Sequence, residues 1–201
     1  MTRVHSGVDP VRRQSFGSFG LLVFAALLTG CATTGPNIIS GYGSMQAAAR
    51  ARSGAHPAID YGGNGGASIL AAADGTVSYA AYSSLCGNGV RVWHVDFNRF
   101  TLYCHMSELR VALGDTVKRG QVIGLLGASG EPTLRTPPGG FPIPQLHFEL
   151  AEDSRPRNDG DLAGSYDPLS ITIGCFSSEK SYPKDRLVLT HPVTCRDAEP
   201  R

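Results

Sequence analysis

Residues 90–106 read VRVWHVDFNRFTLYCHM, and this stretch decides the fold class. Two runs rich in β-branched and aromatic residues, 90–95 and 100–106, flank the polar stretch 96–99. Runs of this kind around a short polar connection are typical of a β-hairpin. The stretch therefore predicts two antiparallel strands joined by a short turn.

The neighbouring sequence continues this pattern. The apolar run 69–73 leads through Asp74-Gly75 into the extended run 76–82, and a D-G between two such runs predicts another hairpin. Residues 111–127 (VALGDTVKRGQVIGLLG) then alternate short apolar runs with glycine-bearing turns. Every candidate element is extended, so we expect an all-β domain, an antiparallel sheet or sandwich with few or no long helices, over residues 54–170.

The regions around these strands differ in composition. Residues 31–53 are rich in Gly, Ser, Thr and Ala and suit a short tether. Residues 131–144 (EPTLRTPPGGFPIP) contain five prolines and two glycines, so they predict a loop and no central strand. Residues 171–201 form a C-terminal extension without a readable motif.

The first thirty residues are typical of an export signal. Three arginines precede the apolar run 21–28, which is too short to span a bilayer. The run ends in Leu28-Thr29-Gly30-Cys31, which resembles the bacterial lipobox, so we expect a signal peptide over residues 1–30 and a lipid on Cys31. The alternative is an uncleaved anchor, or a chance apolar stretch that ends in a buried cysteine. In a Gram-negative envelope, Ala32 after the cysteine would imply a lipid anchor in the outer membrane, facing the periplasm.

Charge excludes one class of partner. The chain has 18 Lys and Arg against 17 Asp and Glu. A nearly balanced chain lacks the basic footprint of a nucleic-acid-binding protein.

If Cys31 carries lipid, four cysteines remain in an oxidising compartment, which favours disulfides. Three pairings of four cysteines exist. We favour Cys86 with Cys104, flanking the predicted hairpin, and Cys175 with Cys195, closing a loop in the extension, because these pairings minimise the separation between partners. A zinc site built from cysteines is the competing interpretation, but no C-x-x-C pair is present.

Three segments carry candidate site residues. In HPAID, His56 and Asp60 offer an imidazole and a carboxylate four residues apart, which are donors that zinc takes. By itself this spacing equally fits a solvated loop histidine.

The segment QLHFEL predicts a strand with Gln145, His147 and Glu149 on one face, aimed out of the core. On such a face a solvated histidine is the alternative to a ligand. In LYCHM the same alternation places Tyr103 and His105 together, opposite Leu102, Cys104 and Met106.

Taken together, the three segments resemble the lysostaphin-type (LytM) zinc metallopeptidases. The pattern of that family is H-x-x-x-D, then Y-x-H, then H-x-H followed by Phe-Glu, in the order found here. The framing sequences AADGTVSYA, GDTVKRGQVIGLLGASG and YDPL are also similar to the family. The resemblance covers about residues 54–170 and implies a LytM-type (duplicated hybrid motif) β fold.

The resemblance implies that His56, Asp60 and His147 hold one Zn²⁺ per domain, with the fourth position open as a hydrolytic site requires. It assigns His105 and Gln145 to the positions of the family's two catalytic histidines. Gln145 departs from the pattern, because an amide can donate a hydrogen bond but cannot take up a proton.

Three further residues have simpler interpretations. Glu149 shares a face with His147 and could hold it from behind, or could act as a surface ion-pair partner. His94 and His191 are most simply structural or solvated.

Three functions remain open at this point. The leading hypothesis is a zinc metalloendopeptidase that cuts peptides of peptidoglycan beside the membrane. The alternative is a non-catalytic LytM-like envelope lipoprotein that binds the wall or activates an amidase, because a fold does not guarantee its chemistry. A biotinyl or lipoyl carrier is the third, but Lys118 lacks the preceding Met of the modified motif.

Overall fold

The computed structural model describes residues 1–2, 35–44, 55–131, 140–152 and 162–195. Chain contacts separate residues 1–30 from residues 31–201, and every strand belongs to the second unit. The predicted signal peptide and Cys31 lie outside the described residues. None of the described residues belongs to a helix with the length and hydropathy of a membrane span.

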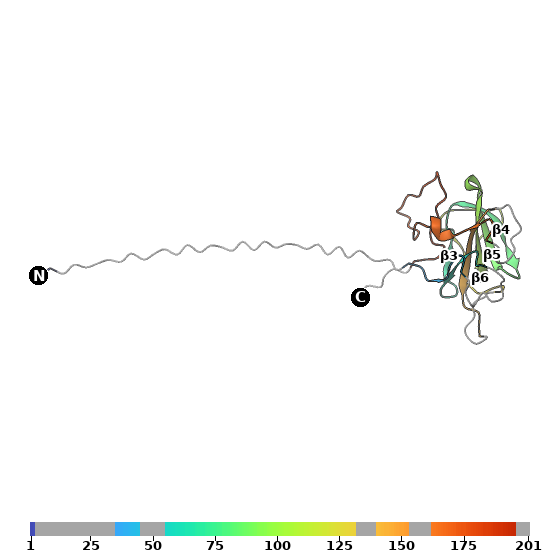
Figure 1. Cartoon of the computed structure of the whole chain (residues 1–201), viewed down its shortest axis with the longest axis horizontal. Coiled ribbons are helices and arrows are strands. Elements are labelled where there is room, and N and C mark those ends of the chain that lie inside the picture. Colours follow the sequence, from blue (N-terminus) through green and yellow to red (C-terminus); the bar gives the residue numbers. More distant parts are fainter. Residues whose placement is uncertain (3–34, 45–54, 132–139, 153–161, 196–201) are drawn as a thin grey trace. The chain divides into compact units, whose positions relative to one another are not determined.

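The second unit is almost entirely antiparallel β-structure, which confirms the predicted fold class (Figure 1). An eight-stranded sheet has the order β1-β2-β10-β6-β5-β4-β8, with β11 paired to β10, and a three-stranded sheet has the order β3-β9-β7. Two short 3-10 helices, η2 and η3, complete the described elements. Their bounds are β1 Ile38–Ser40, β2 Ile59–Gly62, β3 Ser68–Leu70, β4 Gly75–Ser83, β5 Gly87–His94, η2 Val95–Phe97, β6 Arg99–Met106, β7 Glu108–Leu109, β8 Thr116–Val117, β9 Val122–Leu125, β10 Gln145–Ala151, β11 Ser165–Tyr166 and η3 Pro168–Ile171.

The predicted hairpin of residues 90–106 is confirmed as strands β5 and β6. Its closing pair is His94 with Arg99, and η2 followed by Asn98 connects the strands. Asn98 has a φ of 49°, a left-handed conformation that Asn adopts more readily than most residues. The polar connection therefore turns the chain without a glycine.

The hairpin predicted at Asp74-Gly75 is wrong, because β3 and β4 belong to different sheets. The Asp74 carboxylate accepts hydrogen bonds from the backbone N–H of Arg119 (2.8 Å) and from Lys118 Nζ (3.3 Å). Ala71 donates its N–H to the carbonyl of Gln121 (2.9 Å). The segment between the two runs thus forms its hydrogen bonds with the turn at 118–121 and not with a hairpin partner. The chain passes there from one sheet to the other.

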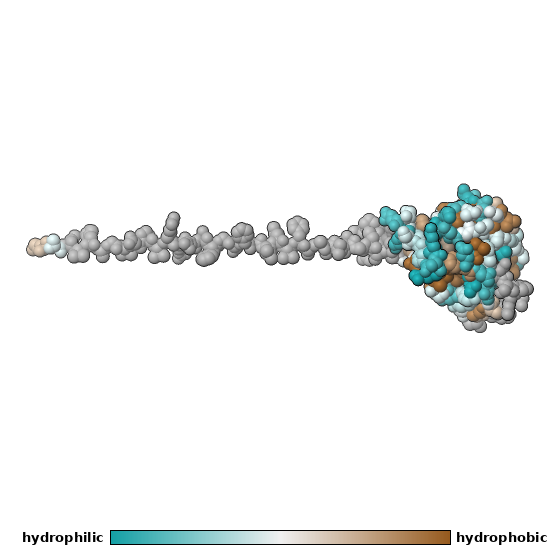
Figure 2. Space-filling view, turned by 90° about the horizontal axis from the view of Figure 1, so that it is seen from above, coloured by the Kyte–Doolittle hydropathy of each residue, from teal (hydrophilic) through white to brown (hydrophobic). Residues whose placement is uncertain are grey.

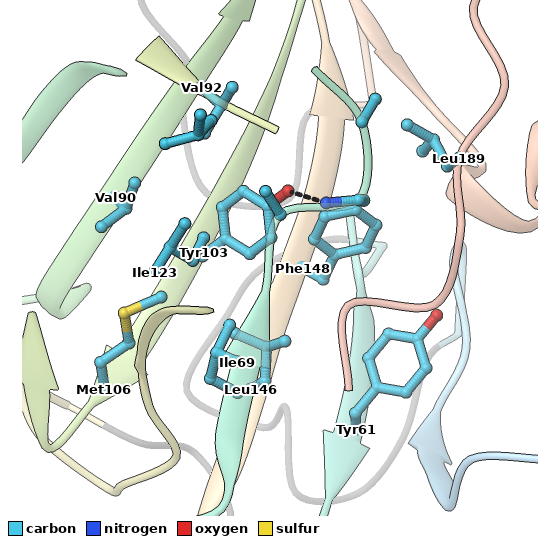
Figure 3. Packing of buried hydrophobic residues seen from close by; sticks show 14 of the residues in the cluster. Tyr61, Ile69, Val90, Val92, Tyr103, Met106, Ile123, Leu146, Phe148 and Leu189 are labelled. Atoms are coloured by element: carbon cyan, nitrogen blue, oxygen red, sulfur yellow. Dashed lines mark hydrogen bonds between the residues drawn. The ribbon is translucent and has the colours of Figure 1, made fainter. Parts of the chain in front are cut away.

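The core lies between the two sheets, where aromatic and aliphatic side chains interdigitate (Figure 3). At its centre the rings of Tyr103 and Phe148 lie 5.1 Å apart. The buried Tyr103 hydroxyl accepts the N–H of Ala72 at 2.9 Å, the dashed contact of Figure 3. This bond satisfies the buried N–H of Ala72, and the same hydroxyl also accepts from Thr101 Oγ1 at 3.1 Å.

His94 is structural, in line with its simplest interpretation. It is buried, Nδ1 donates to the Asp74 carbonyl (2.7 Å), and Nε2 contacts the Thr101 hydroxyl (3.0 Å). Burial lowers its pKa, which keeps the ring neutral near pH 7.

Residues of the predicted extension 171–201 pack into the core. Leu189 is completely buried and belongs to the hydrophobic cluster. Thr190 donates its N–H to the carbonyl of Ala72 (2.9 Å), and Leu70 donates to that of Pro192 (2.8 Å). The structure contains both expected disulfides, Cys86–Cys104 and Cys175–Cys195.

The outer surface of the second unit mixes hydrophobic and hydrophilic residues, as the brown and teal areas of Figure 2 show. The exposed large hydrophobic residues include Tyr82, Leu113 and Phe141. Single exposed hydrophobic residues are normal on a folded protein and carry no functional implication by themselves.

Truncation of Leu189 tests whether the C-terminal residues stabilise the core. We expect Leu189→Ala to lower the free energy of unfolding by about 2–5 kcal/mol, because it leaves a cavity in a packed interior. Leu113→Ala is the matched control, since that leucine is 70% exposed. Urea unfolding of the full chain measures both changes, and equal midpoints for the two variants would contradict the packing described here.

Candidate metal centre

Three side chains from two distant segments meet at one buried point. The Asp60 Oδ1 atom lies 3.0 Å from His147 Nδ1 and 3.3 Å from His56 Nε2. The two imidazole nitrogens are 3.2 Å apart. All three residues are at most 5% exposed, and together they could hold a metal ion.

The pairing of β2 with β10 explains why they meet. In this antiparallel register Asp60 stands directly opposite His147, so their side chains project from the same face. The neighbours Ile59 and Tyr61 point to the other face and join the core cluster. His56 lies just before β2 and reaches the same point four residues earlier in the chain.

The residues just before the predicted domain hold His56 from behind. His56 Nδ1 lies 3.1 Å from the Gly41 carbonyl oxygen and 3.2 Å from Ser40 Oγ. A carbonyl oxygen only accepts, so Nδ1 carries the proton of the neutral ring, and Nε2 points its lone pair toward the place where the three side chains meet. Ser40 belongs to β1, an edge strand of the main sheet within the range predicted to be a tether.

Glu149 holds His147 in the same way. His147 Nε2 donates to Glu149 Oε1 at 2.9 Å, and both side chains are buried. This contact favours the interpretation of Glu149 as an orienting partner over that of a surface ion pair. A carboxylate behind a ligand histidine fixes the tautomer that presents the other nitrogen to a metal.

The charges of the cluster fit a cation at its centre. Burial by itself would raise the pKa of Asp60, but the close contacts with His147 and His56 outweigh it and hold that pKa well below its usual range. Burial likewise opposes a charge on His147, but the carboxylates of Asp60 and Glu149 raise its pKa to about 9. Two imidazole nitrogens and a carboxylate oxygen are a donor set that suits zinc.

His105 reaches the site through a bulge that the alternation rule did not anticipate. Strand β6 has one extra residue between Tyr103 and Met106 relative to β5, and both of these residues point into the core. His105 has a φ of 67°, which is rare for a side chain of this size. The prediction that Tyr103 and His105 share a face is therefore wrong, because the bulge turns the imidazole toward His147, with ring centroids 5.9 Å apart.

Ser129, which no motif singled out, holds the bulge in place. Its carbonyl accepts from His105 Nδ1 (2.9 Å), and its hydroxyl donates to the Met106 carbonyl (2.6 Å) and accepts the N–H of Asn88 (2.9 Å). A Cβ at Gly87 would lie 2.3 Å from Ser129 Oγ, so this approach requires glycine. Ser129 belongs to the segment GASG (residues 127–130), which in the sequence alone is only a sign of the family. In the structure this segment fixes the tautomer of His105.

Gln145 lies two residues before His147 on the same face of β10. The predicted face of Gln145, His147 and Glu149 does point away from the hydrophobic core cluster, but all seven residues of β10 are buried, so this face lines a buried site and not an exposed surface. Gln145 is 1% exposed, and among the described residues nothing donates a hydrogen bond to its Oε1. A buried amide oxygen without a donor costs about 1–3 kcal/mol, a cost that is unusual in a packed interior and that functional sites can carry.

The family now follows from direct comparison. The model of peptidase family M23 matches residues 54–159, more than half of the chain. The chain belongs to peptidase family M23. The lysostaphin-type resemblance is thereby confirmed, and the site lies within the matched residues.

Relatives share parts of this domain. The peptidoglycan DD-endopeptidase ShyC of Vibrio cholerae is 36% identical over 96 residues, 48% of this chain and 20% of that protein. The DD-carboxypeptidase/endopeptidase Mpg of Neisseria meningitidis is 32% identical over 108 residues, 54% of this chain and 23% of that protein. This chain thus spans about a quarter or less of these relatives. The catalytic domain of lysostaphin from Staphylococcus simulans superimposes with a TM-score of 0.55 at 27% identity, over 67% of this chain and 90% of that domain.

Neutralising the residue behind His147 tests the metal centre. We expect Glu149→Gln to weaken zinc binding by about 10- to 100-fold, because the amide no longer fixes the histidine tautomer. The matched control is Glu108→Gln, an exposed glutamate that pairs with Arg110. Competition with a chelator of known affinity measures both variants, and equal affinities would show that Glu149 does not support the site.

Proposed function

We propose that this chain is a zinc metalloendopeptidase that hydrolyses peptide bonds of peptidoglycan. The observation that carries the proposal is the buried cluster of His56, Asp60 and His147, whose inward atoms lie within 3.3 Å of one another. Membership of the M23 family and the named activity of ShyC, a peptidoglycan DD-endopeptidase, support the same reaction.

The chain's own atoms have distinct roles in this proposal. His56 Nε2, Asp60 Oδ1 and His147 Nδ1 hold the zinc ion, and Gly41 and Glu149 fix the two imidazoles. Bound zinc polarises a carbonyl and lowers the pKa of a water molecule toward neutrality. All three donors are buried, and electrostatic effects are stronger in such a site than in water.

His105 serves as the proton carrier. Because its Nδ1 hydrogen is held by the Ser129 carbonyl, its Nε2 is the basic nitrogen that can take a proton from the attacking water. The bulge fixes the ring near His147, so little conformational entropy is lost when the reaction begins.

Gln145 serves as the donor to the oxyanion. Its amide N–H can stabilise negative charge on the carbonyl oxygen, but it carries no positive charge of its own. Losing one charged or proton-transferring group costs about 10²- to 10⁴-fold in rate. We therefore infer a slow peptidase.

Gln145 also supports the second candidate, because it lacks the imidazole of the family pattern. That candidate is a non-catalytic LytM-like envelope protein that binds the wall or activates an amidase. In both cases we propose that residues 1–30 are a signal peptide and that lipid on Cys31 anchors the chain in the outer membrane, facing the periplasm. The domain over residues 54–170 would then lie beside the peptidoglycan.

Hydrolysis distinguishes the two candidates. We expect the full chain, purified in detergent, to release peptides with new termini from purified peptidoglycan, and chelator to abolish the release. Mass spectrometry identifies the termini, and His147→Ala serves as the inactive control. Absence of any chelator-sensitive product would contradict the peptidase and favour the non-catalytic candidate.

Restoring the imidazole tests the role of Gln145. We expect Gln145→His to raise the rate at least about tenfold, because the ring can carry charge at the oxyanion where the amide cannot. Gln121→His, at an exposed turn residue, is the matched control. An unchanged initial rate of peptide release would show that Gln145 does not contact the reacting group.

A further inference from the structure

A pocket lies near the end of the β5–β6 hairpin that is remote from the candidate metal centre. It has a volume of about 680 Å³ and lies between the end of β5, with η2, and residues 176–188. His94 lines the pocket and pairs with Arg99 at the start of β6, whereas His105 lies near the other end of β6. The six residue steps from Arg99 to His105 correspond to about 20 Å of strand. The pocket is therefore separate from the metal centre.

Residues of the C-terminal region form one rigid wall of this pocket. The Arg119 guanidinium donates to the carbonyls of Ala72 and Val188 and lies over the ring of Tyr182, 4.5 Å from its centroid. Tyr182 stacks on Phe176, and its hydroxyl accepts the N–H of Ser177 at 2.8 Å. Arg119 thus fastens residues 176–188 to the sheet.

The charged residues of this wall that line the pocket are basic, whereas Glu179 and Asp185 of the same segment do not line it. Lys180, Lys184 and Arg186 line the pocket, and among the described residues none of their side chains contacts an acceptor. Of the acidic lining residues, Asp74 already pairs with Lys118. The remaining acid, Asp96, leaves the pocket with a positive balance that favours an anionic ligand.

Aromatic rings supply the rest of the lining. Trp93 and Phe97 come from β5 and η2, and Phe176 and Tyr182 come from the opposite wall. Rings of this kind offer flat apolar faces, which pack against the C–H faces of sugar rings or against aliphatic side chains. A ligand that fits this lining combines carboxylates with flat apolar faces.

We propose that this pocket binds a carboxylate-bearing segment of peptidoglycan, as a second contact with the polymer beside the metal centre. The proposal rests on peptidoglycan as the proposed substrate. Stem-peptide carboxylates pair with Lys180, Lys184 and Arg186, and the aromatic rings contact the glycan. Binding at two places about 20 Å apart raises the effective concentration of the polymer at the metal centre.

The test measures binding and does not depend on hydrolysis. The full chain in detergent is sedimented with purified peptidoglycan in the presence of chelator. We expect Arg186→Glu to weaken binding about fivefold, whereas Arg110→Glu, which makes the same charge change at an exposed site on the other sheet, does not. Equal binding by the two variants would overturn the proposal.

Chemical modification of the wall identifies the partner group. When the carboxylates of the peptidoglycan are converted to amides, we expect the difference between the wild-type chain and Arg186→Glu to vanish. A difference that survives amidation would overturn the assignment to carboxylates. Vesicles of anionic lipid that compete as well as soluble peptidoglycan fragments would assign the pocket to lipid and overturn it as well. A failed hydrolysis assay would leave this binding comparison unaffected.

Discussion

The pairing of β2 with β10 is the constraint on which the rest of the site depends. It places Asp60 opposite His147 on the face away from the core, while Ile59, Tyr61 and Phe148 anchor the same two strands from the other face. A register shift of one residue would exchange these faces and scatter the donors. The hydrophobic core therefore fixes the geometry of the candidate metal centre.

The imidazoles of this buried site also need fixed orientations, which hydrogen bonds to their outer ring nitrogens provide. Gly41 holds His56, Glu149 holds His147, and the Ser129 carbonyl holds His105, so each imidazole has one ring nitrogen bound to a fixed acceptor. The left-handed backbone at His105 is strained, with a cost of about 1–3 kcal/mol that persists only where the surroundings enforce it. Here the contacts of Ser129 enforce it, which links a glycine-rich segment to the chemistry.

Much of this arrangement could be predicted from the sequence, because the residues that carry the chemistry are local motifs on strands. The β5–β6 hairpin and the two disulfide pairings followed from strand pattern and spacing. Period-two alternation failed at His105, since alternation assumes a strand without a bulge. The D-G signal failed because a hairpin needs its flanking strands to pair, and tertiary contacts of Asp74 decided otherwise. Ser40 contacts His56 and Leu189 packs in the core, but both lie in segments without any motif. Their roles therefore become visible only in the folded chain.

X-ray absorption of zinc bound to the full chain tests the central claim most directly. With one equivalent of zinc, the account predicts a first shell of nitrogen and oxygen atoms at about 2.0–2.1 Å and multiple-scattering features of two imidazoles. Scattering from sulfur at about 2.3 Å, or a shell without imidazole, would contradict it.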